Sequence, residues 1–351
     1  MLFQVPTVAS RAHDAYDLRM QLHDEPTTRT PLRVIISLDV EEEGLFSGSY
    51  KATGCGVRNV SLLPRLAPLS QELGFPLTLF CAYTVLSSAD CRPVLAWMRD
   101  TCGAEIAAHL HHWSTPPFGP DTGGGPPLRT HCLPPELLRS RLRNLLAAGR
   151  DFQSAPLTSF RMGRWDLKAS LLPLLVEEGI TLDSSICPLR AFAKGADHFL
   201  APADPYWADQ VPDHSLLEAP ITQIPLHPVL ARTWYGLTAS QPDLLDKFHF
   251  WGTLSANPIW HSAAIMRLAS RLHVGRGGKV LSLFWHSSEM LPSASPHIPN
   301  QAAADALLQK ITDFLQWLKE RFNVQGITAA GLRAEAETLG FSGRPAGQGD
   351  W

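Results

Sequence analysis

The stretch Leu32–Glu43 reads LRVIISLDVEEE and decides the fold class. Its first seven residues are mainly apolar and rich in β-branched side chains, a composition typical of a strand that is buried on both faces of a sheet. Acidic residues follow this strand directly. In parallel α/β folds the catalytic groups gather beyond the carboxyl ends of the strands, so the acidic run marks the place where a site is expected.

The same pattern of buried strand and amphipathic helix repeats along the chain. Further strands are predicted at 76–82, 104–109, 157–161, 180–186 and 280–285, and helices at 60–73, 94–102, 136–148, 167–178 and 303–322. Strands that alternate with helices pair in parallel through crossover connections. The sequence therefore predicts an α/β fold with a parallel sheet.

The 351 residues suit one large α/β domain as well as two ordinary ones. Residues 1–30 are polar, lack periodicity and are predicted to be an N-terminal extension. Residues 31–340 form the predicted catalytic domain, in which 188–278 is an elaborated region with short strands and at least one helix near 262–272. Residues 341–351 are rich in glycine and are predicted to be a disordered tail.

Composition narrows the classes of partner. The net charge is −3 and no basic stripe occurs, so nucleic acid is not an expected partner. No window approaches the roughly 18 consecutive apolar residues of a membrane helix. The N-terminus has no apolar core of a signal peptide, which predicts a cytoplasmic protein. The six cysteines form no C-x-x-C pair, and we assign them no role.

Polar residues that can carry chemistry follow several of the predicted strands. Asp39 and Glu41 stand two residues apart after the first strand, and residues i and i+2 of an extended chain point to one side. His109 and His111 have the same spacing. A carboxylate with two imidazoles is a common catalytic zinc set that leaves positions for water. A solvated acidic turn and structural histidines are the plain alternative.

Two further strand ends supply charged groups. Arg161 can pair with Asp39 and keep that carboxylate ionised and oriented, although an ordinary salt bridge would look the same in sequence. His286 follows an apolar strand and can act as a general acid. Aromatic residues of the elaborated region are candidate stacking faces for sugars or, more simply, core side chains: Trp234, Tyr235, Phe248, Phe250, Trp251 and Trp260.

Seven short motifs occur in an order that resembles one known family. They are S-L-D-V-E (37–41), E-I-A-A-H-L-H-H-W-S-T-P-P (105–117), F-R-M-G-R-W (160–165), L-D-S-S-I (182–186), P-Y-W (205–207), E-A-P-I-T (218–222) and F-W-H-S-S-E (284–289). From about residue 32 to 339 the chain resembles the polysaccharide deacetylase, or NodB-homology, family, and within it the WalW-like branch of surface-polysaccharide proteins.

This resemblance implies a fold and a set of roles. The fold is a distorted (β/α)7-type barrel with parallel strands, and the cofactor is a divalent metal, usually Zn²⁺. By resemblance Asp39 is the catalytic base, His286 is the acid and Arg161 orients Asp39, while His109 is the first metal histidine.

The chain departs from the family pattern at two positions. Many members have adjacent aspartates, but Val40 intervenes here, so Glu41 becomes the metal candidate. Many members have a second histidine four residues after the first, where this chain has Trp113. The second metal histidine is then His111 or His112, and His111 is preferred because it shares the strand face of His109.

The expected function is metal-dependent removal of an N-acetyl group from an amino sugar of a bacterial surface polysaccharide or its precursor. The expected partner is an N-acetylated carbohydrate. Three alternatives stay open: a metal-dependent hydrolase of a non-sugar amide or ureide, a glycoside hydrolase that uses Asp39 and a neighbouring glutamate, and a carbohydrate-binding protein without activity.

Overall fold

The structure is a computed structural model that describes residues 30–122 and 126–344. Apart from Thr30, the predicted N-terminal extension lies outside the described residues, as does the tail from residue 345. The prediction of a disordered tail is wrong for residues 341–344, because Phe341 is buried in an apolar cluster and Gly343–Arg344 pair with another strand. The high glycine content of this stretch led to the prediction of disorder although it begins with the apolar residue Phe341.

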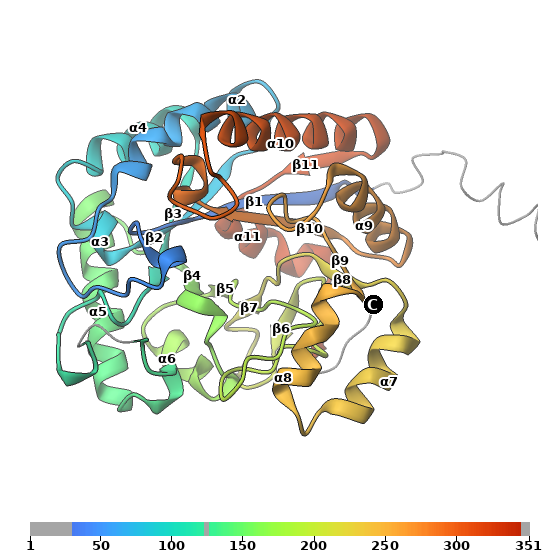
Figure 1. The fold of residues 1–351 in the computed structure, drawn as a ribbon, viewed down its shortest axis with the longest axis horizontal. Helices are drawn as coiled ribbons and strands as arrows, with labels where there is room; N and C mark the ends of the chain where they lie inside the picture. Colours follow the sequence, from blue (N-terminus) through green and yellow to red (C-terminus); the bar gives the residue numbers. More distant parts are fainter. Residues whose placement is uncertain (1–29, 123–125, 345–351) are drawn as a thin grey trace, which may run out of the picture.

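The strands form one curved sheet around a central interior (Figure 1). Its strands are β1 (Leu32–Val40), β2 (Leu77–Ala82), β3 (Glu105–Leu110), β4 (Ser159–Met162), β5 (Leu182–Asp183), β6 (Tyr206–Ala208), β7 (Leu217–Glu218), β10 (Val280–His286), β11 (Val324–Gly326) and β12 (Gly343–Arg344). The order is β10-β1-β2-β3-β4-β5-β7-β6-β12, with β11 on β1, and the β6–β7 pair is antiparallel. The other strand pairs of this sheet are parallel, as predicted.

The chain after β7 brings the two ends of this order together. Ala219 N donates to Asp183 O of β5, and Ile221 N donates to Ile186 O. The next residue, Thr222, donates from its backbone N to Ser282 O of β10 at 3.0 Å. Strands β10, β1, β2, β3, β4, β5 and β7 thus surround one interior, closed by an irregular segment. The predicted fold class, an α/β fold with parallel strands in a distorted barrel, is confirmed.

Most of the helices cover the outside of the sheet (Figure 1). The α-helices of the described residues are α2 (Ala67–Gln71), α3 (Tyr83–Leu86), α4 (Arg92–Cys102), α5 (Pro135–Gln153), α6 (Leu172–Glu177), α7 (Pro228–Thr238), α8 (Pro242–Leu245), α9 (Ala263–Gly275), α10 (Gln301–Arg321) and α11 (Ala329–Leu339). The predicted helix 60–73 is instead a 3₁₀ segment, Arg58–Leu66, followed by α2. Pro64 and Pro68 interrupt it, since proline lacks the N–H that an α-helix needs.

Side chains of β1 alternate between the two sides of the sheet. Val34, Ile36 and Leu38 join the outer core beneath the helices, and each such burial contributes about 1.5–3 kcal/mol. Ile35 packs inside the barrel against α11, through residues such as Leu332. Helix α11 therefore fills the amino-terminal end of the interior, where Arg33 of β1 pairs with Glu335. Ser37 and Asp39 of β1 lie toward the carboxyl end of the strand.

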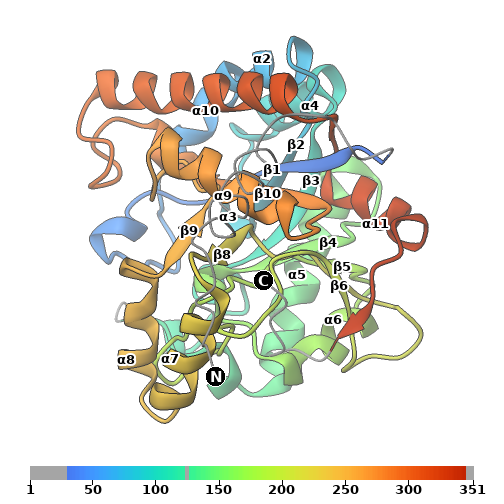
Figure 2. The same ribbon diagram turned by 90° about the vertical axis from the view of Figure 1, so that its right-hand side faces the viewer.

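The elaborated region forms its own small layer beside the barrel (Figure 2). Strands β8 (Gln223–Pro225) and β9 (Thr253–Ser255) pair antiparallel, and α7 and α8 lie between them in sequence. Their apolar side chains gather in a separate cluster that includes Phe199, Phe248 and Ala269 of α9. The predicted helix near 262–272 is α9, whose first turn is capped by Ser262.

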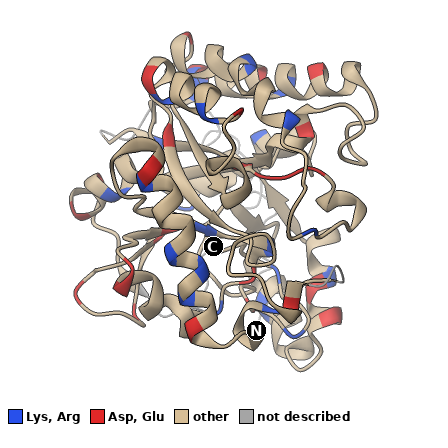
Figure 3. Cartoon of the chain, turned by 90° about the vertical axis from the view of Figure 1, so that its left-hand side faces the viewer, with Lys and Arg blue, Asp and Glu red and all other residues tan. Residues whose placement is uncertain are grey.

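Positions of acidic and of basic residues are interspersed along the chain in the view of Figure 3. Among residues 30–122 and 126–344, no helix combines the length and the apolar character needed to cross a membrane.

Candidate metal centre and active site

Charged side chains converge at the carboxyl end of the barrel interior. Asp39 of β1 is the register partner of His286 at the end of β10, and His109 of β3 is the register partner of Arg161 of β4. Glu41 follows β1 directly. Strands β1, β3, β4 and β10 thus bring together predicted residues from four parts of the sequence. Because burying charged groups costs free energy unless they find partners, their mutual arrangement decides what the site can bind.

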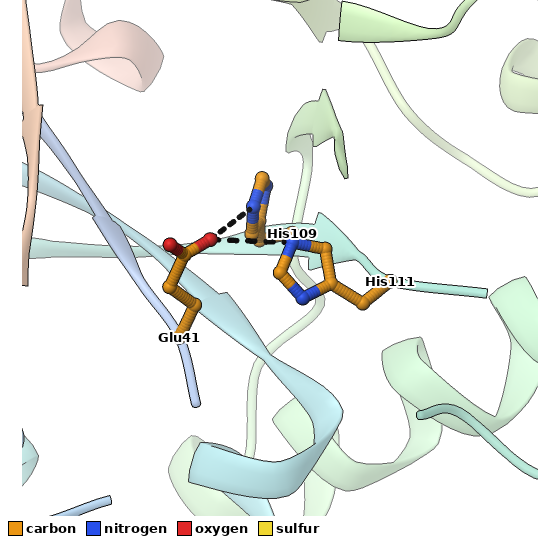
Figure 4. A group of neighbouring side chains, drawn as sticks. All are labelled: Glu41, His109 and His111. Atoms are coloured by element: carbon orange, nitrogen blue, oxygen red, sulfur yellow. Dashed lines mark ion pairs between the residues drawn. The ribbon is translucent and has the colours of Figure 1, made fainter. Parts of the chain in front are cut away.

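Glu41, His109 and His111 point at one another (Figure 4). Glu41 Oε2 lies 3.4 Å from His109 Nε2 and 3.2 Å from His111 Nε2. One ligand atom from each residue lies within 4.8 Å of the others, and all three residues are buried. This is the group that strand-face spacing predicted.

The opposite nitrogen of each imidazole is held by an acceptor. His109 Nδ1 lies 3.0 Å from the carbonyl oxygen of Arg161, and His111 Nδ1 lies 3.1 Å from Glu42 Oε1. Because Nδ1 of each ring donates to one of these oxygens, Nε2 is the ring atom that faces Glu41. Two imidazoles and one carboxylate aimed at a common point fit a divalent metal of the zinc type, which would take the place of the protons on Nε2.

Glu41 carries the negative charge of this group. Burial raises the pKa of the Glu41 carboxyl, but the charge of His286 and hydrogen bonds from His109 and His111 lower it more, so that its pKa lies below the ordinary value. The carboxylate is therefore ionised and able to act as a ligand.

Glu42 is a further candidate residue of this site that the sequence pattern did not indicate. Besides His111 Nδ1, its carboxylate accepts hydrogen bonds from Ser114 Oγ at 2.8 Å and Thr84 Oγ1 at 3.0 Å. Burial raises the pKa of Glu42, but the charge of His111 and its hydrogen bond outweigh this effect, so that the pKa lies below its ordinary value. A carboxylate behind a metal histidine fixes the ring and raises its basicity.

Asp39 is paired with a fully buried arginine. Arg161 Nη1 donates to Asp39 Oδ1 at 2.5 Å, and Arg161 Nη2 donates to Ser37 Oγ and Ser184 Oγ. The guanidinium also lies 4.2 Å from the ring centroid of Phe80. Burial raises the pKa of Asp39, but the charge of Arg161 and the nearby histidines outweigh it, so its pKa is lowered. Asp39 is thus an ionised carboxylate with Oδ2 still free to accept a proton.

His286 stands on the other side of Asp39 and is the most accessible of these residues, with 21% of its side chain exposed. Its Nε2 lies 3.8 Å from Asp39 Oδ2. Its Nδ1 lies 3.0 Å from Glu289 Oε2, a second carboxylate to which sequence reasoning gave no role. Burial lowers the pKa of His286, but the charges of Glu289 and Glu41 raise it to about 10. The imidazole can therefore hold a proton at the mouth of the site.

The structure distinguishes His111 from its neighbours His112 and Trp113. Trp113 is buried and stacks on the ring of His111, with centroids 4.3 Å apart. His112 faces away from the group: its Nε2 lies 3.0 Å from Leu128 O, and burial lowers its pKa to about 4. The structure thus places His111, and not His112, beside Glu41 and His109.

The candidate aromatic residues divide into two sets. Phe248 is fully buried, and Trp234 and Tyr235 pack against its cluster. By contrast, Phe250 is 79% exposed, Trp251 48% and Trp260 39%. Only the second set offers free ring faces.

Comparison with known proteins gives structural relatives and no sequence relatives. No protein-family model matches the chain, and no curated protein matches it. A provisionally assigned glycoside hydrolase/deacetylase from Parabacteroides distasonis superposes with a TM-score of 0.57 at 12% identity, over 89% of this chain and 73% of that chain. PuuE allantoinase gives 0.54 at 14% identity, over 91% and 95%.

A provisionally assigned polysaccharide deacetylase from Mycobacterium smegmatis gives a TM-score of 0.50 at 16% identity, over 91% of this chain and 98% of that chain. At such identities these similarities show the fold. The resemblance to the polysaccharide deacetylases is therefore confirmed for the fold, while the WalW-like branch stays a prediction.

Proposed function

We propose that this chain is a metal-dependent hydrolase that removes the N-acetyl group from an amino sugar of a bacterial surface polysaccharide or its precursor. The observation that carries the proposal is that two sets of side chains meet in one buried site, one suited to bind a metal and one suited to transfer protons. Glu41, His109 and His111 form a metal-type donor set, and Asp39 lies beside it between Arg161 and His286.

Glu41, His109 and His111 would hold the ion, for which Zn²⁺ is the best candidate. A divalent ion bound there supplies a Lewis acid that polarises an amide carbonyl and makes water more acidic. Glu42 keeps His111 oriented from behind, and the Arg161 carbonyl does the same for His109. These contacts fix the two Nε2 atoms before any substrate arrives.

Asp39 and His286 are suited to move the protons of an amide hydrolysis. Asp39 Oδ2 accepts the proton of the attacking water, while Arg161 holds the other carboxylate oxygen and keeps the group ionised. His286 donates the proton of its Nε2 to the amide nitrogen as the C–N bond breaks. The products are acetate and a free amine, and without this proton the amine is a poor leaving group.

A second candidate is hydrolysis of a non-sugar amide or cyclic ureide by the same groups. The fold shared with PuuE allantoinase favours including it, although that similarity concerns the fold. A cytoplasmic location and the absence of a nucleic-acid partner stay predictions from the sequence.

The test is acetate release from N-acetylhexosamines and their oligomers, with allantoin as the ureide control. We expect acetate release that a chelator abolishes and added zinc restores. Turnover of allantoin alone would favour the ureide alternative. Cleavage of glycosidic bonds that is insensitive to chelation would favour a glycoside hydrolase. No turnover by zinc-loaded protein would contradict the proposal.

A further inference from the structure

Large apolar side chains that stay exposed are concentrated in one short part of the described chain. Of the eleven such residues, six lie within residues 226–251 of the elaborated region. These six define what we call the α7 apolar face: Leu226, Val229, Leu230, Leu237, Phe250 and Trp251. Single exposed apolar residues are ordinary on a protein surface, but a group of them marks a contact surface for a protein or a membrane.

Half of this face is a stripe along α7. The helix packs Trp234 and Tyr235 against the local core of the elaborated region. At about 100° per residue, Val229, Leu230 and Leu237 fall on the other side of the helix, where they are 62%, 44% and 72% exposed. The remaining exposed positions of the stripe carry a threonine and a glycine. A surface helix normally turns polar and charged residues to water, so an apolar outer stripe indicates a second contact surface.

The other three residues of the face lie beside this stripe. Leu226 N donates to Gly252 O at 2.9 Å, which places Leu226 next to the strand that follows Trp251. The ring of Trp251 lies edge-on to Trp234 of α7, with centroids 5.2 Å apart. Helix α7 lies at the outer edge of the molecule in both views (Figures 1 and 2). The six side chains therefore belong to one region of the outer surface.

Two exposed cations border the α7 apolar face. Arg276 donates from Nη1 to Pro225 O at 2.9 Å and from Nη2 to Leu226 O at 3.1 Å, so its charge lies beside Leu226. Lys247 comes three residues before Phe250 in the chain. In the part of the chain that the structure describes, neither cation forms a salt bridge with a carboxylate. Both charges thus remain available to an anionic partner.

Acidic residues do not cancel this positive border. The acids of residues 226–251 are Asp243 and Asp246, and Asp246 is neutralised by a 2.7 Å salt bridge with Arg190. The one charged residue in the sequence of α7 is Arg232. The border is therefore positive, although the net charge of the whole chain is −3.

We propose that the α7 apolar face docks on the surface of an anionic lipid bilayer, with its apolar side chains in the interfacial layer and Arg276 and Lys247 at the headgroups. Helices with an apolar outer face lie in this layer, tryptophan is enriched there, and nearby cations are attracted by anionic lipids. A second copy docked by twofold symmetry would bring the same cations toward one another, whereas an anionic bilayer complements both the apolar side chains and their border. None of these residues belongs to the candidate active site, so the proposal does not depend on the chemistry proposed above.

The experiment is sedimentation of the full chain with vesicles of phosphatidylcholine alone and with vesicles that also contain about one third phosphatidylglycerol. We expect binding to the anionic vesicles, and we expect Leu230→Gln and Leu237→Gln each to lower the partition coefficient about tenfold. Arg276→Gln should lower it about fivefold, and on the anionic vesicles only. The matched control is Leu128→Gln, because Leu128 is 48% exposed but lies outside the α7 apolar face.

The outcomes separate a membrane from other partners. Binding that falls in Leu230→Gln and Leu237→Gln but not in Leu128→Gln, at unchanged melting temperature, would support the proposal. No binding by the wild type, or equal losses in all three variants, would overturn it. A wild-type dimer that binds no vesicles and that Leu237→Gln converts to a monomer would show that a second copy covers this face, and would also overturn it. Equal binding to both kinds of vesicle would overturn the part assigned to Arg276 and Lys247.

Discussion

Two buried groups of carboxylates in this protein behave in opposite ways. In the first, at the end of β1, the pKa values of Asp39 and Glu41 lie below their ordinary values. In the second, Asp183 of β5 and Glu218 of β7 are register partners in the sheet. Burial raises the pKa of Asp183 to about 6, and burial together with the charge of Asp183 raises the pKa of Glu218 well above its ordinary value.

The difference lies in the partners and not in the burial. Arg161 and three histidines surround the first group, so ionised carboxylates are favoured there. The second group has Ser185 as a hydrogen-bond donor and the phenol of Tyr206 on the neighbouring strand. Among the described residues no cation forms a salt bridge with either carboxyl, and the charge of Arg161 lowers the pKa of Asp183 less than burial raises it, so the pair retains a proton. The first group is therefore suited to a metal and to base catalysis, and the second to a neutral structural contact.

The largest expected effect separates the aspartates of the two groups. Asp39→Asn keeps the shape of the side chain but removes the base, so we expect the turnover number for acetate release to fall about 10²–10⁴-fold. Asp183→Asn is the matched control, because it makes the same change at a buried aspartate outside the proposed chemistry. Equal losses in the two variants would contradict the distinction.

An intermediate effect is expected at Glu42, measured as zinc affinity by competition with a chromogenic chelator. Glu42→Gln removes the charge behind His111, and loss of such a partner lowers metal affinity about 10–100-fold. Glu43→Gln changes the next residue, which instead pairs with the exposed Arg58. If both variants bind zinc like the wild type, Glu42 does not support the metal site.

The smallest effect concerns stability at Glu218. Its folded-state pKa lies well above its ordinary value of 4.5, so the unfolded chain loses this proton first as the pH rises, and the wild type loses stability above about pH 4.5. Glu218→Gln removes this titration. Between about pH 5 and 8 we expect the unfolding free energy of the variant to fall less steeply with pH than that of the wild type. The two slopes should differ by up to roughly 1.4 kcal/mol per pH unit. A slope unchanged in denaturant unfolding would contradict a protonated Glu218.

The regular part of the fold could be predicted because burial leaves a local signal. The apolar runs of β1, β2 and β10 and the stripe of α10 appear directly in the sequence. The rest could not be read this way. β5 has two residues where seven were predicted, because the chain there leaves the sheet to hydrogen-bond through side chains such as Ser184 and Ser185. The antiparallel β6–β7 pair is too short to show a period.

The candidate site likewise contains residues that the sequence predicts and residues that it does not. Glu41, His109 and His111 were predictable because alternate residues of an extended chain share a face. By the same rule Glu42 was not expected in the site, because in a continued β1 its side chain would point to the face opposite to that of Glu41. β1 ends at Val40, and the chain beyond it lets Glu42 reach the back of His111. Glu289 had a visible signal, the three-residue spacing from His286 that allows it to accept from both His286 N and Nδ1.

The most direct test of the account is the zinc content of the wild type, His111→Ala and His112→Ala, measured by elemental mass spectrometry after dialysis against zinc. The two histidines are adjacent and both buried, but only His111 faces Glu41 and His109. The account predicts about one zinc per chain in the wild type and in His112→Ala, and its loss in His111→Ala. Zinc retained by His111→Ala and lost by His112→Ala, or none in the wild type, would contradict it.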